Sequence, residues 1–168
     1  MSQDSTKDVL NYDEQNVPKL TTGLNVLTIL TFIGCAYELY STVNNFISGR
    51  KALEDFEKSQ EKLADAPAWA KKLASPEVHE VMVKSLDNKV PLIIIGLVSI
   101  ALCVYGAIEM RKLKKQGFTF WLIGEILPYI GVVIFIGGVF FKTFLVYFTI
   151  VPVIFILLYF FQRKNLVY

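Results

Sequence analysis

Residues and motifs that carry chemistry are scarce in this sequence of 168 residues. It holds one histidine and two cysteines, whereas a zinc site usually needs three or four protein ligands. The G-x-S-x-G, H-E-x-x-H and glycine-rich phosphate-binding signatures are missing, and so is an N-x-S/T acceptor. We therefore predict no catalytic residue, no cofactor and no metal, which argues against an enzyme.

Charged residues are also sparse. Asp, Glu, Lys and Arg make up 19% of the chain, and no long block of like charge suits nucleic acid. The one dense basic group lies between two apolar runs and consists of Arg111, Lys112, Lys114 and Lys115. A basic cluster in that position is typical of a membrane surface. We expect the lipid bilayer to be a partner and expect no nucleic acid.

Long apolar runs dominate what the sequence does contain. Four of them are long enough to cross the ~30 Å hydrocarbon core as a helix, which takes roughly 20 residues. The predicted transmembrane helices cover 20–47, 90–110, 118–138 and 143–162. Around them we expect a polar tail (1–19), an extramembrane loop (48–89), a basic turn (111–117), a short turn (139–142) and a C-terminal tail (163–168). The tail at 1–19 lacks the basic and apolar regions of a signal peptide, so the first span is the expected insertion signal.

The first span carries a polar seam. On a heptad, its a and d positions hold Thr21, Leu24, Thr28, Thr31, Cys35, Glu38, Thr42 and Asn45, and all but Leu24 are small or polar. Such residues allow helices in lipid to approach closely, and a 3.5-residue period is typical of left-handed packing. We expect this seam to face the protein interior and the opposite face to contact lipid.

Small residues also share one face in the second and third spans. They are Gly96, Ser99, Cys103 and Ala107 in the second span and Gly124, Gly131 and Gly138 in the third. We predict that the seam packs against both faces, and that the fourth span, apolar on all sides, faces lipid. Pro128 and Pro152 lie inside spans and should kink them. The predicted fold is an all-α membrane protein with four transmembrane helices in a left-handed bundle.

The extramembrane loop at 48–89 is expected to be mostly helical. Ser48-Gly49 can end the first helix, and Ser75-Pro76-Glu77 provides the cap, the proline and the acid of a new helix. His79 lies between two glutamates without a second nitrogen ligand, so we expect an exposed side chain there. The loop then forms an ordered surface outside the membrane.

Two acids inside the predicted spans form a candidate polar site, together with Thr28 and Thr31 on the seam. A carboxylate inside a membrane is costly, so Glu38 and Glu125 are candidates for a path that carries ions or protons. The alternative for Glu38 is a structural bond to a neighbouring helix. Whether the two acids face a water-accessible cavity or packed side chains separates these interpretations.

A structural alternative also exists for Glu125. We place it seven residues into the third span, close enough to the headgroups to bond Arg111 or Lys115. Pro128 removes the backbone hydrogen bond to the Gly124 carbonyl, which leaves an acceptor that a protonated Glu125 can also use. The sequence leaves the structural and the functional role of Glu125 open.

Basic residues predict the orientation in the membrane. They favour the cytoplasm when they lie in short loops, as in the dense cluster of the basic turn. With four spans, that turn shares its side with both termini, including Arg163 and Lys164. We predict cytoplasmic termini and an outside loop at 48–89. The loop carries many dispersed basic residues as well, so the inverted orientation stays open.

One stretch resembles a known group. The sequence YGAIEMRKLKKQGF, from Tyr105 to Phe118, and the Gly124-Glu125-Ile126 that follows resemble small uncharacterised four-span membrane proteins of Bacteroidetes-type bacteria. The likeness covers about 20 residues. It implies a bacterial inner (plasma) membrane and brings no activity or catalytic residue with it.

The function that the sequence favours is non-enzymatic. We expect an accessory or scaffold subunit of the membrane that associates with other membrane proteins or with further copies of itself. The alternative is a small transporter or channel that uses the polar seam with Glu38 and Glu125. A membrane enzyme is a third class, but it would need more than two embedded acids.

Overall fold

The computed structural model describes residues 19–60, 67 and 75–168, and every regular element in these ranges is helical. In chain order they are α2 (Thr22–Gln60), α4 (Pro76–Asp87), α5 (Lys89–Arg111), α6 (Lys115–Phe135), α7 (Gly138–Gln162) and the short 3-10 helix η2 (Arg163–Asn165). The predicted all-α class is confirmed. Our expectations for residues 1–18, 61–66 and 68–74 lie outside the described residues.

Three helices are long and apolar enough to cross a membrane, namely Thr22–Ser59 within α2, α5 and α6. With 23 residues, α5 extends about 35 Å at 1.5 Å per residue, which is enough for the hydrocarbon core. These helices support the predicted membrane class. The fourth predicted span coincides with α7, a helix of 25 residues. That α7 crosses the membrane and that the bundle is left-handed stay predictions.

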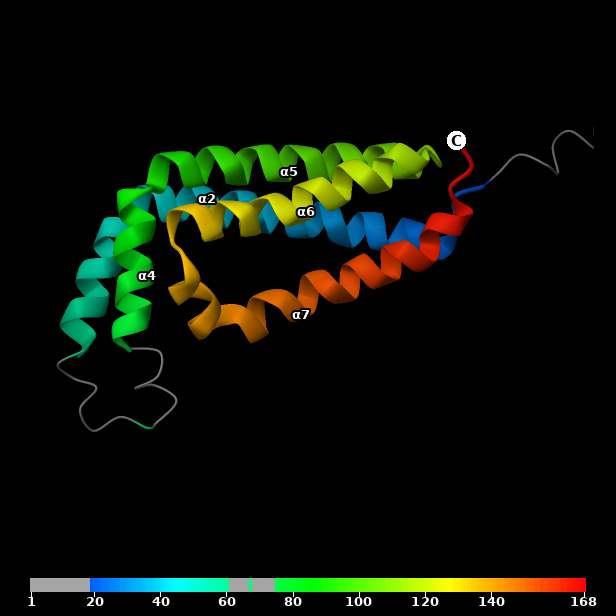
Figure 1. Ribbon diagram of the computed structural model, residues 1–168. Helices are drawn as coiled ribbons and strands as arrows, with labels where there is room; N and C mark the ends of the chain where they lie inside the picture. The colour runs from blue at the N-terminus through cyan, green and yellow to red at the C-terminus, as the bar shows by residue number, and fades with distance from the viewer. Residues whose placement is uncertain (1–18, 61–66, 68–74) are drawn as a thin grey trace, which may run out of the picture.

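α5 and α6 form a tight antiparallel hairpin (Figure 1). Glycines lie where the two helices touch. A Cβ atom on Gly106 would lie 2.5 Å from the Trp121 backbone nitrogen, and one on Gly124 would lie 2.7 Å from the Cys103 sulfur. These distances leave no room for a side chain. The predicted small-residue faces therefore meet at Cys103 and Gly124, whereas a Cβ on Gly138 would meet open space.

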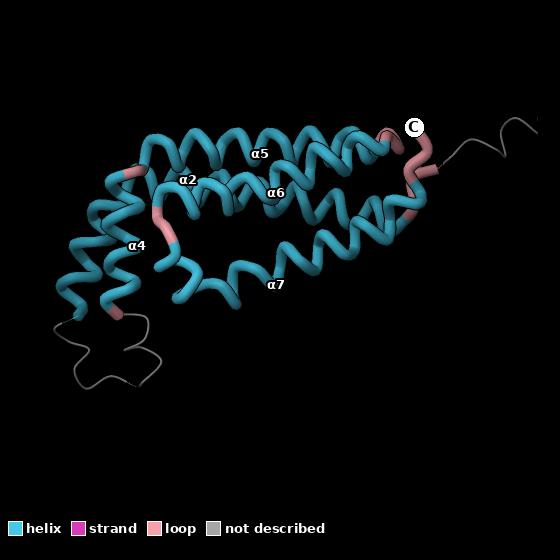
Figure 2. The backbone as a smooth tube through the Cα atoms, viewed as in Figure 1, coloured by secondary structure: helices cyan, strands magenta, loops and turns pink. Residues whose placement is uncertain are grey.

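α2 is a single helix of 39 residues that bends and continues beside α4 (Figures 1 and 2). We expected Ser48-Gly49 to end the first helix, but the helix runs through this pair to Gln60. Contacts with α4 support the second half of α2. Glu57 Oε1 lies 2.9 Å from His79 Nε2, and the Phe56 ring stacks on the His79 ring. The helical part of the loop is thus a hairpin of α4 with the end of α2.

The polar seam of α2 packs against α5 and α7. Our prediction that it also packs against the small-residue face of the third span was wrong, because Gly124 and Gly131 of α6 face α5 instead. Leu24 and Thr28 are fully buried, and Thr31 Oγ1 lies 2.7 Å from the Tyr159 hydroxyl of α7. Tyr159 is 1% exposed, and its ring centre lies 4.4 Å from that of Trp121. Our expectation that the fourth helix faces lipid on all sides is therefore wrong, because Tyr159 turns one side of it into the core.

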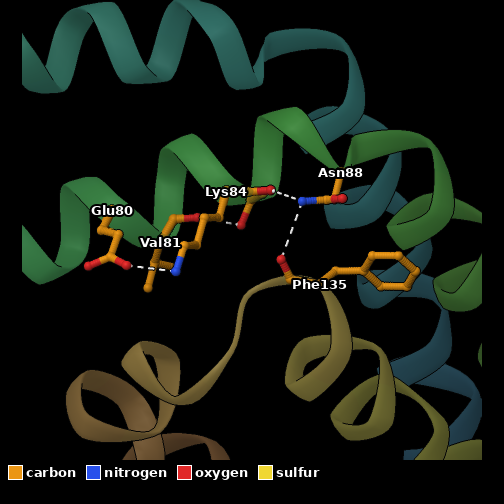
Figure 3. A network of polar contacts seen from close by, with 6 residues as sticks. Glu80, Val81, Lys84, Asn88 and Phe135 are labelled. Atoms are coloured by element: carbon orange, nitrogen blue, oxygen red, sulfur yellow. Dashed lines mark hydrogen bonds and ion pairs between the residues drawn. The ribbon is translucent and has the colours of Figure 1, made fainter.

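A second buried cluster holds the opposite end of the molecule together. Its members come from α4, the end of α6 and the start of α7: Val81, Ile136 and Phe140. Figure 3 shows the Asn88 amide, between α4 and α5, donating to the Lys84 carbonyl at 3.0 Å and to the Phe135 carbonyl at 3.3 Å. This amide joins the ends of α4, α5 and α6.

Candidate functional site

A cavity of about 380 Å³ lies between α2, α5, α6 and α7. It brings together the two acids that the sequence singled out, Glu38 from α2 and Glu125 from α6. The other lining residues are Tyr37, Ser99, Pro128, Tyr129, Val132, Phe140, Val151 and Pro152. Because four helices supply the wall, the site exists only in the assembled fold.

The cavity lies near the middle of the spans. Glu125 is ten residues from each end of α6, or about 15 Å along the helix axis. Ser99, on the facing wall, is ten residues from the start of α5. We counted Glu125 as seven residues into a span that starts at Phe118, whereas α6 itself begins three residues earlier, at Lys115. The depth of Glu125 in the membrane stays a prediction.

The partners expected for a structural Glu125 bond other groups. Arg111 Nη1 donates to Thr28 Oγ1 at 3.1 Å, and Lys115 Nζ donates to the Val167 carbonyl at 3.2 Å. The Gly124 carbonyl, freed by Pro128, accepts a 2.6 Å hydrogen bond from Ser99 Oγ. The structural interpretation of Glu125 therefore loses the bonds on which it rested.

The described contacts of the two carboxylates are weak. Cys103 Sγ lies 3.9 Å from Glu125 Oε2, and a thiol is a poor hydrogen-bond donor. Glu38 makes no hydrogen bond or ion pair with any residue in the described ranges. Among the described residues, neither carboxylate thus has a strong hydrogen-bond partner.

Thr28 and Thr31 belong to a different part of the seam. Thr28 Oγ1 accepts from Arg111 and donates to the Asn25 carbonyl at 2.9 Å. Thr31 bonds the Tyr159 hydroxyl, as described above. Neither threonine lines the cavity. Of the four residues in the predicted polar site, two line the cavity and two fasten α2 to its neighbours.

The basic cluster surrounds one buried acid. The Glu109 side chain is 3% exposed and lies 2.8 Å from Lys112 Nζ and 2.7 Å from Lys114 Nζ. Gln116 Nε2 adds a hydrogen bond of 3.1 Å. The hydrogen bond to Glu109 raises the pKa of Lys114 above its ordinary value. Two of the four cations are thus paired with a buried acid, although the side chains of Lys112 and Lys114 stay 58% and 41% exposed.

The α5–α6 turn, the C-terminal residues and the start of α2 meet at one end of the molecule. The Leu113 carbonyl accepts from the backbone N–H groups of Val167, at 2.9 Å, and Tyr168, at 3.1 Å. Thr21 Oγ1 donates to Gln162 Oε1 at 3.3 Å. The side of the membrane on which this end lies stays a prediction.

Several residues of the site carry no clear signal in the sequence. Ser99 was singled out only as a small packing residue, although its hydroxyl caps the carbonyl that Pro128 frees. The tyrosines Tyr37 and Tyr129 line the cavity beside the acids. Cys35 and Cys103 are buried thiols without a disulfide. Their position in helix cores is consistent with the packing role that we expected.

Comparison with known proteins adds no family. The chain matches no protein-family model, no curated protein and no solved structure. In the part of the chain that the structure describes, no three His, Cys, Asp or Glu side chains gather as metal ligands. The resemblance around Tyr105–Ile126 stays a prediction.

Proposed function

We propose that this chain is a small integral membrane protein that binds a proton or a small cation between Glu38 and Glu125 and conducts or transports it. One observation carries the proposal: two acids from different helices line one cavity near the middle of the spans. The sequence alone favoured an accessory subunit. The cavity favours the transporter or channel instead. If Glu38 and Glu125 had packed against other side chains, a structural role would have been favoured; in this structure both line a cavity.

The solvation of the two carboxylates indicates what can occupy the cavity. An ionised carboxylate in a membrane interior needs a partner, and membrane proteins place such groups along ion and proton paths. The cavity, at about 380 Å³, has room for several waters, since one water takes about 30 Å³ in the liquid. Among its described lining residues the acids have no basic counterpart. A species that enters the cavity and neutralises the acids is therefore a cation or a proton.

Flux through reconstituted vesicles tests the proposal. A pH-sensitive dye inside the vesicles should report proton movement by the wild type under an imposed gradient, with sodium and potassium gradients as further arms. Glu38→Gln and Glu125→Gln should each fold normally and remove the flux, since an amide cannot ionise. Glu54→Gln is the matched control, because Glu54 is an exposed acid of α2 that does not line the cavity. Wild-type vesicles as tight as empty ones would refute the proposal.

The accessory or scaffold subunit is the second candidate function. It is favoured by the hairpin of α4 with the end of α2, which projects from the helices that can span the membrane (Figure 1). The 39 residues of α2 correspond to about 58 Å, nearly twice the hydrocarbon thickness. The partner is another membrane protein or a second copy of this chain. A protein that is monomeric in mild detergent and binds no membrane protein in crosslinked cells would refute this candidate.

The proposed location is the plasma membrane, the inner membrane of a bacterium, with both termini in the cytoplasm. The basic turn supports this orientation, since Arg111 and Lys115 remain outside the ion pairs that Glu109 makes. The proposal assigns no enzymatic activity and no cofactor to the chain.

A further inference from the structure

Two adjoining cavities lie at the end of the molecule where α2 bends beside α4 and α5. The larger measures about 390 Å³ and is walled by apolar residues such as Leu92, Ile93 and Val132. The smaller measures about 270 Å³. They share Phe46, Leu86 and Lys89, so the two cavities adjoin at these residues and form one recess with a larger apolar part and a smaller part.

The smaller part of the recess is basic. Arg50 from α2 and Lys89 from α5 line it, together with a single acid, Asp87. Neither Arg50 nor Lys89 forms an ion pair with another described residue, and the Lys89 ammonium lies 5.2 Å above the Phe46 ring. The nearby Glu80 is paired with Lys84 at 2.6 Å. The balance of charge at the opening therefore favours an anion.

The position and the size of the recess fit a lipid. Lys89 is the first residue of α5, one of the helices able to cross the membrane, so it lies at headgroup level. The larger part is walled on one side by the hairpin of α2 and α4, through residues such as Val81, and on the other by Leu92 and Ile93 of α5, which lie towards the hydrocarbon. A volume of about 390 Å³ is at the small end for ligand pockets, roughly 300–1,000 Å³. It suits part of one acyl chain and excludes a whole lipid.

We propose that this recess binds one anionic phospholipid. Arg50 and Lys89 hold the phosphate, and an acyl chain enters the apolar cavity between α2, α4, α5 and α6. Charge-assisted hydrogen bonds from two basic side chains supply the preference for an anion. The site is separate from the Glu38–Glu125 cavity, and the proposal does not depend on transport.

Native mass spectrometry of the delipidated protein in detergent tests the proposal. The wild type should bind phosphatidylglycerol more tightly than phosphatidylcholine with the same chains. The double variant R50Q/K89Q should lose at least about tenfold in affinity for phosphatidylglycerol. K51Q/K58Q removes the same charge from the exposed surface of α2, outside the recess. It should bind like the wild type.

A second variant tests the acyl-chain part without changing charge. Ile93 of α5 lines the larger cavity on its membrane side, so Ile93→Trp should narrow it and weaken phosphatidylglycerol binding while the melting temperature stays near that of the wild type. Equal affinity for the two lipids would overturn the proposal, as would equal losses in R50Q/K89Q and K51Q/K58Q. Displacement of the lipid by an equal concentration of inorganic phosphate would overturn it too, because the site would then bind phosphate alone.

Discussion

Replacing Gly106 by alanine should destabilise the protein more than the same replacement at a glycine that has no close neighbour. The added Cβ would lie 2.5 Å from the Trp121 backbone nitrogen and 2.6 Å from the Gly117 carbonyl oxygen. Both neighbours are backbone atoms and cannot rotate away. The helices must therefore separate by nearly 1 Å to restore ordinary van der Waals distances of about 3.5 Å.

The expected cost follows from two opposing effects. Overpacking a well-packed contact typically costs about 1–3 kcal/mol, and separating the helices also weakens the neighbouring contact of Gly124 with Cys103. Alanine has the better helix propensity, by up to about 1 kcal/mol relative to glycine. We expect a net loss of about 1–2 kcal/mol.

Gly34→Ala is the matched control, because a Cβ on Gly34 of α2 meets no atom within 4 Å. It should be neutral or slightly stabilising through helix propensity alone. Thermal unfolding of both variants in the same detergent, followed by circular dichroism, measures the difference. Equal melting temperatures for the two variants would refute the close backbone contact between α5 and α6.

Three further predictions concern single bonds and the orientation. Thr31→Val should cost about 1 kcal/mol by leaving the buried Tyr159 hydroxyl unpaired, whereas Thr119→Val, on an exposed part of α6, should be neutral; equal melting temperatures would contradict the role of this bond. Glu109→Gln should lower the melting temperature several times more than Glu80→Gln, because Glu109 is buried between two lysines and Glu80 forms one exposed pair; similar losses would count against the buried cluster. In a protein without native cysteines, Ser59→Cys should react with an impermeant thiol reagent on intact cells and Gln116→Cys should not, and the reverse pattern would establish the inverted orientation.

The sequence predicted the apolar helices and the first part of the inner face of α2 because both follow simple repeats, although Asn45 at the end of the predicted seam is exposed. Thr28, Thr31 and Cys35 recur at heptad spacing among large apolar residues, and all three are buried. The packing of α7 could not be predicted in this way. Its apolar residues surround the helix without a period, so nothing in the sequence distinguishes Tyr159, with its buried hydroxyl partner, from the neighbouring aromatic residues.

The two acids of the candidate site were predicted, but Thr28 and Thr31 lie outside it and the position of Glu125 along its helix was not foreseen. We counted the third span from Phe118, its first apolar residue, although α6 begins at Lys115. Lysine and glutamine are good helix formers, and a lysine can extend its charged end to the membrane surface, so a helix can start before the apolar run. That the Ser99 hydroxyl would take the carbonyl freed by Pro128 depends on the register of two helices, which one sequence does not specify.

The tight hairpin of α5 and α6 divides the wall of the Glu38–Glu125 cavity into a stiff part and a compliant part. Backbones held together through glycine cannot slide or part by small steps without losing contact along the whole interface. The described contacts of α7 lie at Phe140 near its start and from Phe155 to Tyr159 in its second half, with Pro152 at the cavity wall between them. We expect changes in the size of the cavity to come from movement of α7 and α2 rather than of the α5–α6 hairpin. Amide hydrogen exchange should therefore be faster in α7 than in α5 and α6.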